Sequence, residues 1–118
     1  MRIRIHEDSI AIDEPLQAHL ERRLDYALSG FAERVQHLVV RLSNDTPARS
    51  PSFYRFDIDV VLRPRSLKVA DTGANPSIAV TNASDRLVKA VNRALERERA
   101  WLHGEDPPPG EPGRRRGE

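Results

Sequence analysis

From residue 54 to residue 63, apolar and polar side chains alternate along the chain. The first set is Tyr54, Phe56, Ile58, Val60 and Leu62, and the second, polar except for Val61, is Arg55, Asp57, Asp59, Val61 and Arg63. A period of two is typical of a β-strand with one face in a core and the other in water. The segment therefore predicts a sheet that is open to solvent on one side.

Other segments carry weaker strand and loop signals. Residues 2–6 and 35–43 alternate in the same way and predict two more strands. Residues 67–70 are expected to prolong the central strand beyond Pro64, and the polar residues 44–50 and 71–75 have loop and turn chemistry. Residues 77–81 predict a further short strand.

Two segments carry helical signals. Asp13 is placed to cap a helix in which leucine recurs every four residues from Leu16 to Leu28, and Gly30 supplies a stop. The second helix should begin at a cap on Asn82 or Ser84 and run to about residue 101 or 103. Its apolar residues share one face: Leu87, Val91, Ala94, Leu95 and Leu102.

The predicted order is β-α-β-β-β-α, an α+β domain over residues 1–103. It has one mostly antiparallel four-stranded sheet with two helices packed on one face. The predicted inward set is Ile3, Ile5, Leu38, Val40, Leu42, Tyr54, Phe56, Ile58, Val60, Leu62, Ile78 and Val80. Residues 104–118 are rich in proline and glycine and predict a disordered tail.

Composition narrows the range of functions. The chain has 118 residues, enough for one domain, and a formal net charge of only +1. It has no cysteine, which excludes disulfides and thiolate sites. No apolar run approaches ~20 residues and the first residues are no signal peptide, so we expect a cytoplasmic protein without a membrane partner.

The sequence lacks the motifs that carry enzyme chemistry. It contains no phosphate-binding glycine loop, nucleophile elbow or zinc-site spacing. His6 with Asp57 and Asp59 matches no metal-site signature, and His19, His37 and His103 are expected on the surface. We therefore expect no catalytic residue, metal, cofactor or small-molecule substrate.

A basic stripe runs along the predicted last helix. Its residues are Arg86, Lys89, Arg93 and Arg97, spaced three, four and four residues apart. At about 3.6 residues per turn, this spacing puts all four on one side of the helix. A rigid row of cations suits a phosphate backbone, but it is also how an ordinary solvated helix face looks.

The open sheet face is a second candidate surface for RNA. Arg4, Arg41 and Arg55 should lie on it, where they would contact phosphate or stack on bases. The alternative is cross-strand pairing of Arg41 or Arg55 with Asp57 or Asp59. The run Arg114–Arg116 in the tail leaves the same choice between RNA attraction and simple solvation.

Three segments stand out in order along the chain: the leading MRIRI, the LSGFAERV that precedes HLVVRLS, and the PSIAVTNAS that leads into AVNRALERER. Together they resemble the ribosome hibernation-promoting factor family, also called ribosome-associated inhibitors or sigma-factor modulation proteins. The resemblance covers residues 1–99. It implies a domain shaped like double-stranded-RNA-binding domains, bound to rRNA in the decoding channel of the small ribosomal subunit. Such proteins block mRNA and tRNA by occupancy during slow growth or stress.

The resemblance also bears on individual residues. It places Arg97 on a position that is basic in the family, and Lys89 and Arg93 extend the same stripe. Glu98 stands where the family has leucine, at the centre of the apolar face, and the segment from Pro64 to Pro76 is longer than a tight hairpin. The C-terminal domain of long family members has no counterpart, which implies a short form and favours a monomer.

Two functions remain open at this level. One is a ribosome-bound translation inhibitor, supported by the element order and the basic stripe. The other is a protein–protein interaction module of the same fold that does not bind ribosomes, supported by the low net charge and the acidic residues of the sheet face.

Overall fold

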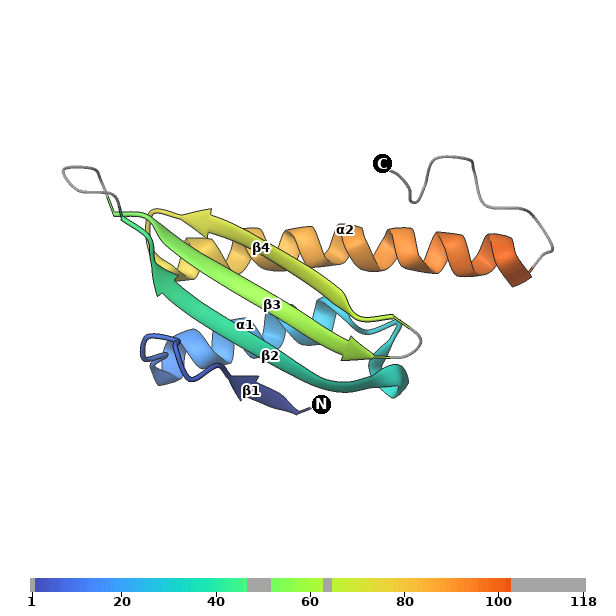
Figure 1. Ribbon diagram of the computed structural model, residues 1–118, viewed down its shortest axis with the longest axis horizontal. Coiled ribbons are helices and arrows are strands. Elements are labelled where there is room, and N and C mark those ends of the chain that lie inside the picture. Colours follow the sequence, from blue (N-terminus) through green and yellow to red (C-terminus); the bar gives the residue numbers. More distant parts are fainter. Residues whose placement is uncertain (1, 47–51, 63–64, 103–118) are drawn as a thin grey trace.

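A computed structural model describes residues 2–46, 52–62 and 65–102, the last four for their backbone only. Its elements are β1 (Ile3–Ile5), α1 (Glu14–Ala27), the 3₁₀ turn η1 (Ala32–Arg34), β2 (Val35–Asn44), β3 (Tyr54–Leu62), β4 (Leu67–Gly73) and α2 (Pro76–Leu102). The predicted order β-α-β-β-β-α is therefore confirmed (Figure 1).

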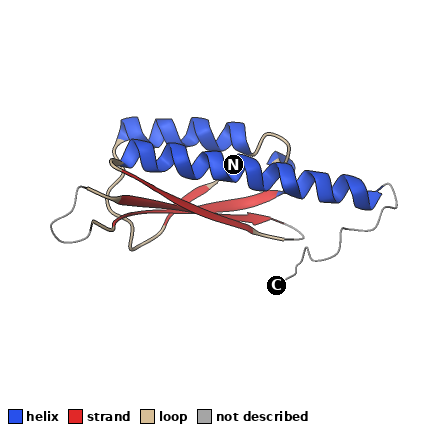
Figure 2. Ribbon diagram, turned by 90° about the horizontal axis from the view of Figure 1, so that it is seen from above, coloured by secondary structure: helices blue, strands red, loops and turns tan. Residues whose placement is uncertain are grey.

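The four strands form one sheet whose spatial order is the chain order, β1-β2-β3-β4. β2, β3 and β4 pair antiparallel, whereas β1 pairs parallel to β2 because α1 returns the chain between them. Both helices cover the same face (Figure 2). The predicted α+β class, with a mostly antiparallel sheet and helices on one face, is confirmed.

The core lies between the helices and the alternating apolar residues of the sheet. Phe56, Ile58 and Val60 of β3 are at most 1% exposed and face leucines of both helices. Ile5 and Ile78 are not buried as expected, since they are 49% and 43% exposed, although the register places Ile5 beside Val40 on the helix-covered face. Ile5 belongs to a three-residue edge strand, and Ile78 lies in the first turn of a helix.

Residues 77–81 are not a strand but the start of α2. Asn75 caps this helix, because its Oδ1 accepts a hydrogen bond from the Ile78 N–H at 2.9 Å and its carbonyl accepts one from Ala79. Pro76 then occupies the first helical position, which suits its fixed φ. The caps expected at Asn82 and Ser84 are wrong, because both residues lie inside the helix.

The fourth strand lies earlier in the chain than predicted. Residues 67–70 do not prolong β3 but begin β4, which takes up most of the segment between Pro64 and Pro76. Gly73 ends β4 against the first turn of α2. A Cβ on Gly73 would come within 2.6 Å of the Ala79 nitrogen, so only glycine allows this close approach.

α1 begins as predicted, with the Leu16 N–H donating to Asp13 Oδ1 at 3.0 Å. It ends at Ala27, before the glycine stop expected at residue 30, and Leu28 follows as the C-cap with 1% of its surface exposed. Within the described residues, no helix combines the length and apolarity needed to cross a membrane. The predictions for Arg63, the tail 104–118 and Arg114–Arg116 fall outside the described residues.

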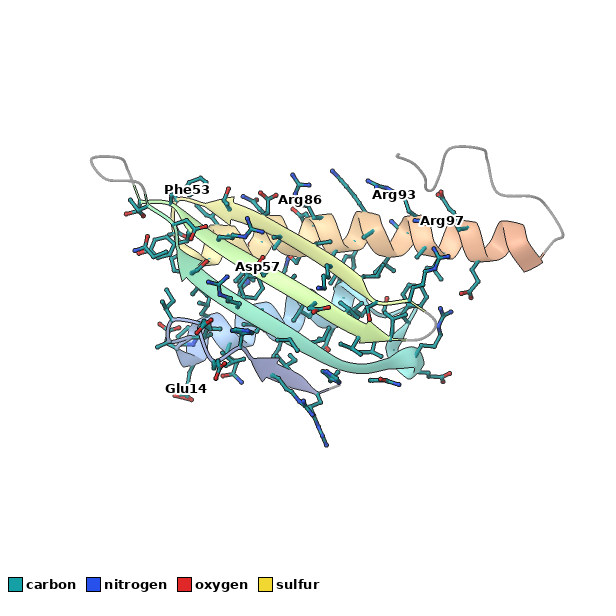
Figure 3. All side chains as sticks on the ribbon, in the orientation of Figure 1. Glu14, Phe53, Asp57, Arg86, Arg93 and Arg97 are labelled. Carbon is teal, nitrogen blue, oxygen red and sulfur yellow. The ribbon has the colours of Figure 1, made fainter. Side chains whose placement is uncertain are left out.

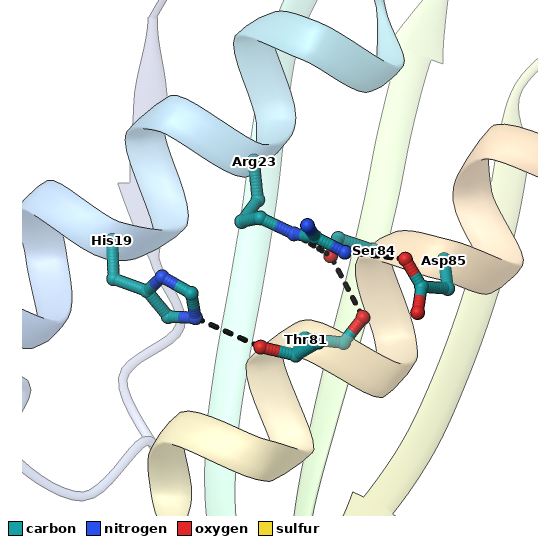
Figure 4. Close-up of polar contacts among 5 residues, drawn as sticks. All are labelled: His19, Arg23, Thr81, Ser84 and Asp85. Carbon is teal, nitrogen blue, oxygen red and sulfur yellow. Dashed lines mark hydrogen bonds and ion pairs between the residues drawn. The ribbon is translucent and has the colours of Figure 1, made fainter.

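α1 and α2 are joined by a row of polar contacts (Figure 4). His19 Nε2 lies 2.9 Å from Thr81 Oγ1, so this histidine is part of the helix interface and not the isolated surface residue that was expected. Arg23 of α1 donates from Nε to Ser84 Oγ at 2.9 Å and pairs with the Asp85 carboxylate. These contacts fix the two helices side by side.

Candidate nucleic-acid interface

The four predicted stripe residues lie in one row on α2, and all are exposed. Figure 3 shows Arg86, Arg93 and Arg97 following one another along the helix. The rise of ~1.5 Å per residue puts Arg86 and Arg97 about 16 Å apart along the axis. Because α2 is one continuous helix from Pro76 to Leu102, the spacing of these cations is rigid.

The stripe borders a groove between α2 and the edge strand β4. The groove has a volume of about 590 Å³. We call it the basic groove, after Arg86, Lys89 and Arg93 of α2; Lys68 lies at its β4 rim, where its ammonium faces Asp59 of the open sheet face. Its remaining lining residues are Val69, Ala70, Asp71, Asn82, Asp85 and Ala90.

Two carboxylates lie in the basic groove, and both are engaged. Asp71 Oδ2 accepts a hydrogen bond from Arg86 Nε at 2.8 Å, and Asp85 is paired with Arg23 of α1. The Arg86 hydrogen bond, together with one from the Thr72 N–H, holds the pKa of Asp71 below its ordinary value. Both acids of the groove are therefore already paired with arginines of this protein.

Lys89, Arg93 and Arg97 form no ion pair with any residue in the described part of the chain. Arg86 is compensated by Asp71, so the net positive charge of the stripe is concentrated on its C-terminal three members. Cations that have no acidic partner among the described residues suit an anionic partner outside the protein.

The open sheet face differs from the basic groove. In the register of the sheet, Arg4, Arg41 and Arg55 lie on the face away from the helices, so the structure does not bring them together with the stripe. Arg55 Nε lies 3.1 Å from Asp57 Oδ1, and Lys68 Nζ lies 3.9 Å from Asp59 Oδ2. Charges of both signs are thus interspersed on this face.

The ion pairs on the open sheet face differ from the cross-strand pairs that the sequence predicts. Arg55 and Asp57 pair along one strand, two residues apart, and the cross-strand partner of Asp59 is Lys68. Arg41 stands opposite Asp57 in the register but forms no ion pair with a described residue, and its Nε is buried without a hydrogen-bond partner there.

His6 does not join these aspartates. Its Nδ1 accepts the Asp8 N–H at 3.0 Å, within the turn that follows β1. Nowhere in residues 2–46, 52–62 and 65–102 do three His, Asp or Glu side chains gather in a way that would hold a metal ion.

Glu98 does not disrupt the helix. Both of its carboxylate oxygens accept from Arg34 Nη1, at 2.8 and 2.7 Å. The same guanidinium lies 4.5 Å from the centre of the Phe31 ring. An arginine from η1 therefore covers the carboxylate, and α2 continues past it with Arg97 exposed.

Two residues beside the stripe are not predicted by the sequence pattern. Lys68 lies on β4, which the pattern does not identify as a separate strand, and its position opposite Asp59 follows from the pairing of β4 with β3. Tyr26 lies on α1, and nothing in its local pattern shows which helix packs next to it. It is 72% exposed and lies near Lys89 of α2.

Solved structures supply the comparison. A ribosomal subunit interface protein from Coxiella burnetii superposes with a TM-score of 0.67 at 12% identity, covering 81% of this chain and 99% of that one. The chain has the fold of a ribosomal subunit interface protein. The Protein Y N-terminal domain from Thermus thermophilus matches with a TM-score of 0.59 at 22% identity, covering 78% and 93%.

These likenesses confirm at the level of fold the resemblance that the sequence motifs indicate. At identities below 25% they show the fold alone. No protein-family model matches the sequence, and the search of curated proteins gives no match. The fold alone therefore does not assign a function, which depends on the surface residues of this chain.

Proposed function

We propose that this protein is a translation inhibitor of the cytoplasm that binds rRNA of the small ribosomal subunit through the basic groove and the stripe. The observation that carries the proposal is the row Lys89, Arg93 and Arg97. These cations lie on a rigid helix and are not paired with described acids, in a fold that ribosomal subunit interface proteins share.

The proposed mechanism is occupancy without chemistry. Lys89, Arg93 and Arg97 would contact successive phosphates, while Arg86, held by Asp71, would set the distance between α2 and the β4 wall of the groove. The domain would then fill the decoding channel, where mRNA and tRNA would otherwise lie, during slow growth or stress. No cofactor, metal or catalytic residue is needed for this action.

Salt dependence of binding to purified small subunits tests the proposal. Each phosphate contact adds about 0.7 to the slope of log K against log salt on single strands, and about 0.9 on a duplex. The triple variant Lys89→Gln/Arg93→Gln/Arg97→Gln should bind much more weakly and lose about 2 to 3 units of slope.

The matched control removes three cations from the other side of the sheet. Arg2→Gln/Arg4→Gln/Arg55→Gln has the same change in net charge but leaves the basic groove intact. If both triple variants lose the same affinity and slope, only net charge matters and the stripe is not the contact. If the unaltered protein stays unbound at low salt, the proposal is wrong.

The decoding-channel location has its own test. Small subunits preloaded with mRNA and tRNA should bind the protein at least ten times more weakly than empty subunits. Equal binding to both would place the protein elsewhere on the subunit and overturn the occupancy mechanism.

The alternative is a protein–protein interaction module of the same fold. It is favoured by the ion-paired sheet face, where Asp57 and Asp59 take up Arg55 and Lys68. It predicts a purified protein partner whose binding survives nuclease and high salt. That binding would be weakened by Arg4→Gln/Arg55→Gln and unaffected by the stripe variant.

A further inference from the structure

Tyr26 is the most exposed large apolar side chain in the described part of the molecule, at 72%. It lies on α1 at a depression of about 550 Å³ between the two helices. The depression is lined by Arg23, Tyr26, Asp85, Val88 and Lys89. An aromatic ring that is exposed to water beside two cations contributes little to core packing. Its position therefore suggests a role other than core packing.

The charged residues of the depression are partly paired with one another. Arg23 donates to Ser84 Oγ at 2.9 Å and pairs with the Asp85 carboxylate (Figure 4). The charge of Asp85 is therefore balanced by Arg23, and the arginine is fixed in place. Lys89 has no ion-pair partner among the described residues. The depression thus combines an exposed ring, an apolar side chain at Val88 and one uncompensated cation.

Lys89 connects the depression to the basic groove, because it lines both. Because Lys89 and Tyr26 line the same depression, a strand with a phosphate on Lys89 lies beside the exposed ring of Tyr26. This adjacency of a backbone-binding cation and an aromatic face is the arrangement found in proteins that bind single-stranded nucleic acid.

We propose that Tyr26 stacks on one unpaired nucleobase of the same RNA strand whose phosphates the basic groove holds. The inference rests on the proposed function and adds to it the form of RNA bound. In an A-form duplex the base faces are covered by their neighbours, so a ring at this position selects an unstacked, single-stranded nucleotide. A protein segment would gain less here, since the depression offers it no unpaired acid or deep apolar cavity.

Three single variants test the inference on purified small subunits. Tyr26→Leu should weaken binding by about 5- to 150-fold, the loss expected for one base–aromatic stack, with the salt slope unchanged. Tyr26→Phe keeps the ring and should stay within about threefold of the unaltered protein. Lys89→Gln should lower the slope by about 0.7, as expected for one lost phosphate contact.

The outcomes separate this inference from the function on which it rests. If the unaltered protein binds with a steep salt slope but Tyr26→Leu binds equally well, stacking is wrong and the proposed function stands. A Tyr26→Phe variant as weak as Tyr26→Leu would also overturn stacking, because the hydroxyl would then be the contact. If the unaltered protein does not bind at all, the proposed function and the inference fail together.

Discussion

The carboxylate of Asp71 on β4 holds the guanidinium of Arg86 on α2 across the basic groove, with 2.8 Å between Oδ2 and Nε. This contact joins the edge of the sheet to the helix that carries the stripe. It also removes one of the four stripe charges from competition for an external anion. At one end of the groove Arg86 is therefore held by an acid of the protein. From Lys89 onward the stripe cations are available to an external anion.

The Asp71–Arg86 pair should make stability depend on pH on the acid side. The hydrogen bond from Arg86 lowers the folded-state pKa of Asp71 below its ordinary value of 3.8. The contribution is therefore fully present above that value and is lost as the pH falls through the folded-state pKa. For an exposed pair we expect a few tenths to about 1 kcal/mol.

Urea unfolding of Asp71→Asn and of the unaltered protein would measure this effect. The two should differ by the stated amount at about pH 6, and the difference should shrink towards about pH 2.5 as Asp71 protonates. A difference that is equal at both pH values would show that the carboxylate charge is not the cause.

The Arg34–Glu98 pair should contribute modestly to the stability of the end of α2. Both side chains are about one third exposed or more, at 34% and 40%, so a double-mutant cycle with Arg34→Gln and Glu98→Gln should give a coupling of about 0.5–1 kcal/mol. Thermal unfolding in low salt and in 1 M salt would measure it, and the coupling should fall in high salt.

Glu98→Leu, which places an apolar side chain at this position, is a second test of the same contact. It removes a partner of Arg34 but leaves the guanidinium over the Phe31 ring. We expect its stability to lie within about 1 kcal/mol of the unaltered protein. A loss of several kcal/mol would mean that the pair, and not apolar packing, holds this part of α2.

Gly73→Ala should destabilise the domain by about 1–3 kcal/mol, as expected for overpacking. Its Cβ would meet backbone atoms of the first turn of α2, at 2.6 Å from Ala79 N and 2.9 Å from Ile78 C. Gly30→Ala is the matched control, since its Cβ would meet only the flexible end of Leu95, at 3.3 Å. Equal losses of melting temperature in the two variants would contradict this explanation.

Asn75→Ala should cost about 1 kcal/mol, the usual effect of removing a helix N-cap. The lost contact is the hydrogen bond from the Ile78 N–H to Asn75 Oδ1. Asn75→Asp or Asn75→Ser keeps an acceptor and should restore most of the stability in urea unfolding. If alanine and serine were equally harmful, the side chain would act through another contact.

The sequence was sufficient for those parts of the fold in which pattern and environment agree. The alternation in β3 and the leucine spacing of α1 each report a real buried face, and Asp13 caps its helix as expected. Residues 77–81 failed because Ile78, Val80 and Thr81 have β-branched side chains typical of strands. The cap at Asn75 and the packing of Val80 on the sheet outweigh that local preference.

In the candidate site, too, the local features were predictable from the sequence and the tertiary contacts were not. The stripe lies within one helix, so its geometry follows from the spacing of four residues. Lys68 and Tyr26 reach the same region from β4 and α1, and their proximity to α2 depends on tertiary packing that no local pattern encodes. Likewise, the partner of Glu98 comes from Arg34, 64 residues away in the chain.

The identity of strand order and chain order has a consequence for how the molecule folds. Each strand pairs only with a neighbour in sequence, so no pairing requires closure of a loop that spans more than one connection. The strand pairings are thus local along the sheet, but α1 contacts α2 through residues 61 and 62 positions apart, so we expect the intermediate folding rate of mixed α/β domains. We expect β2, β3 and β4 to assemble first, with the three-residue β1 joining last, after α1 has docked.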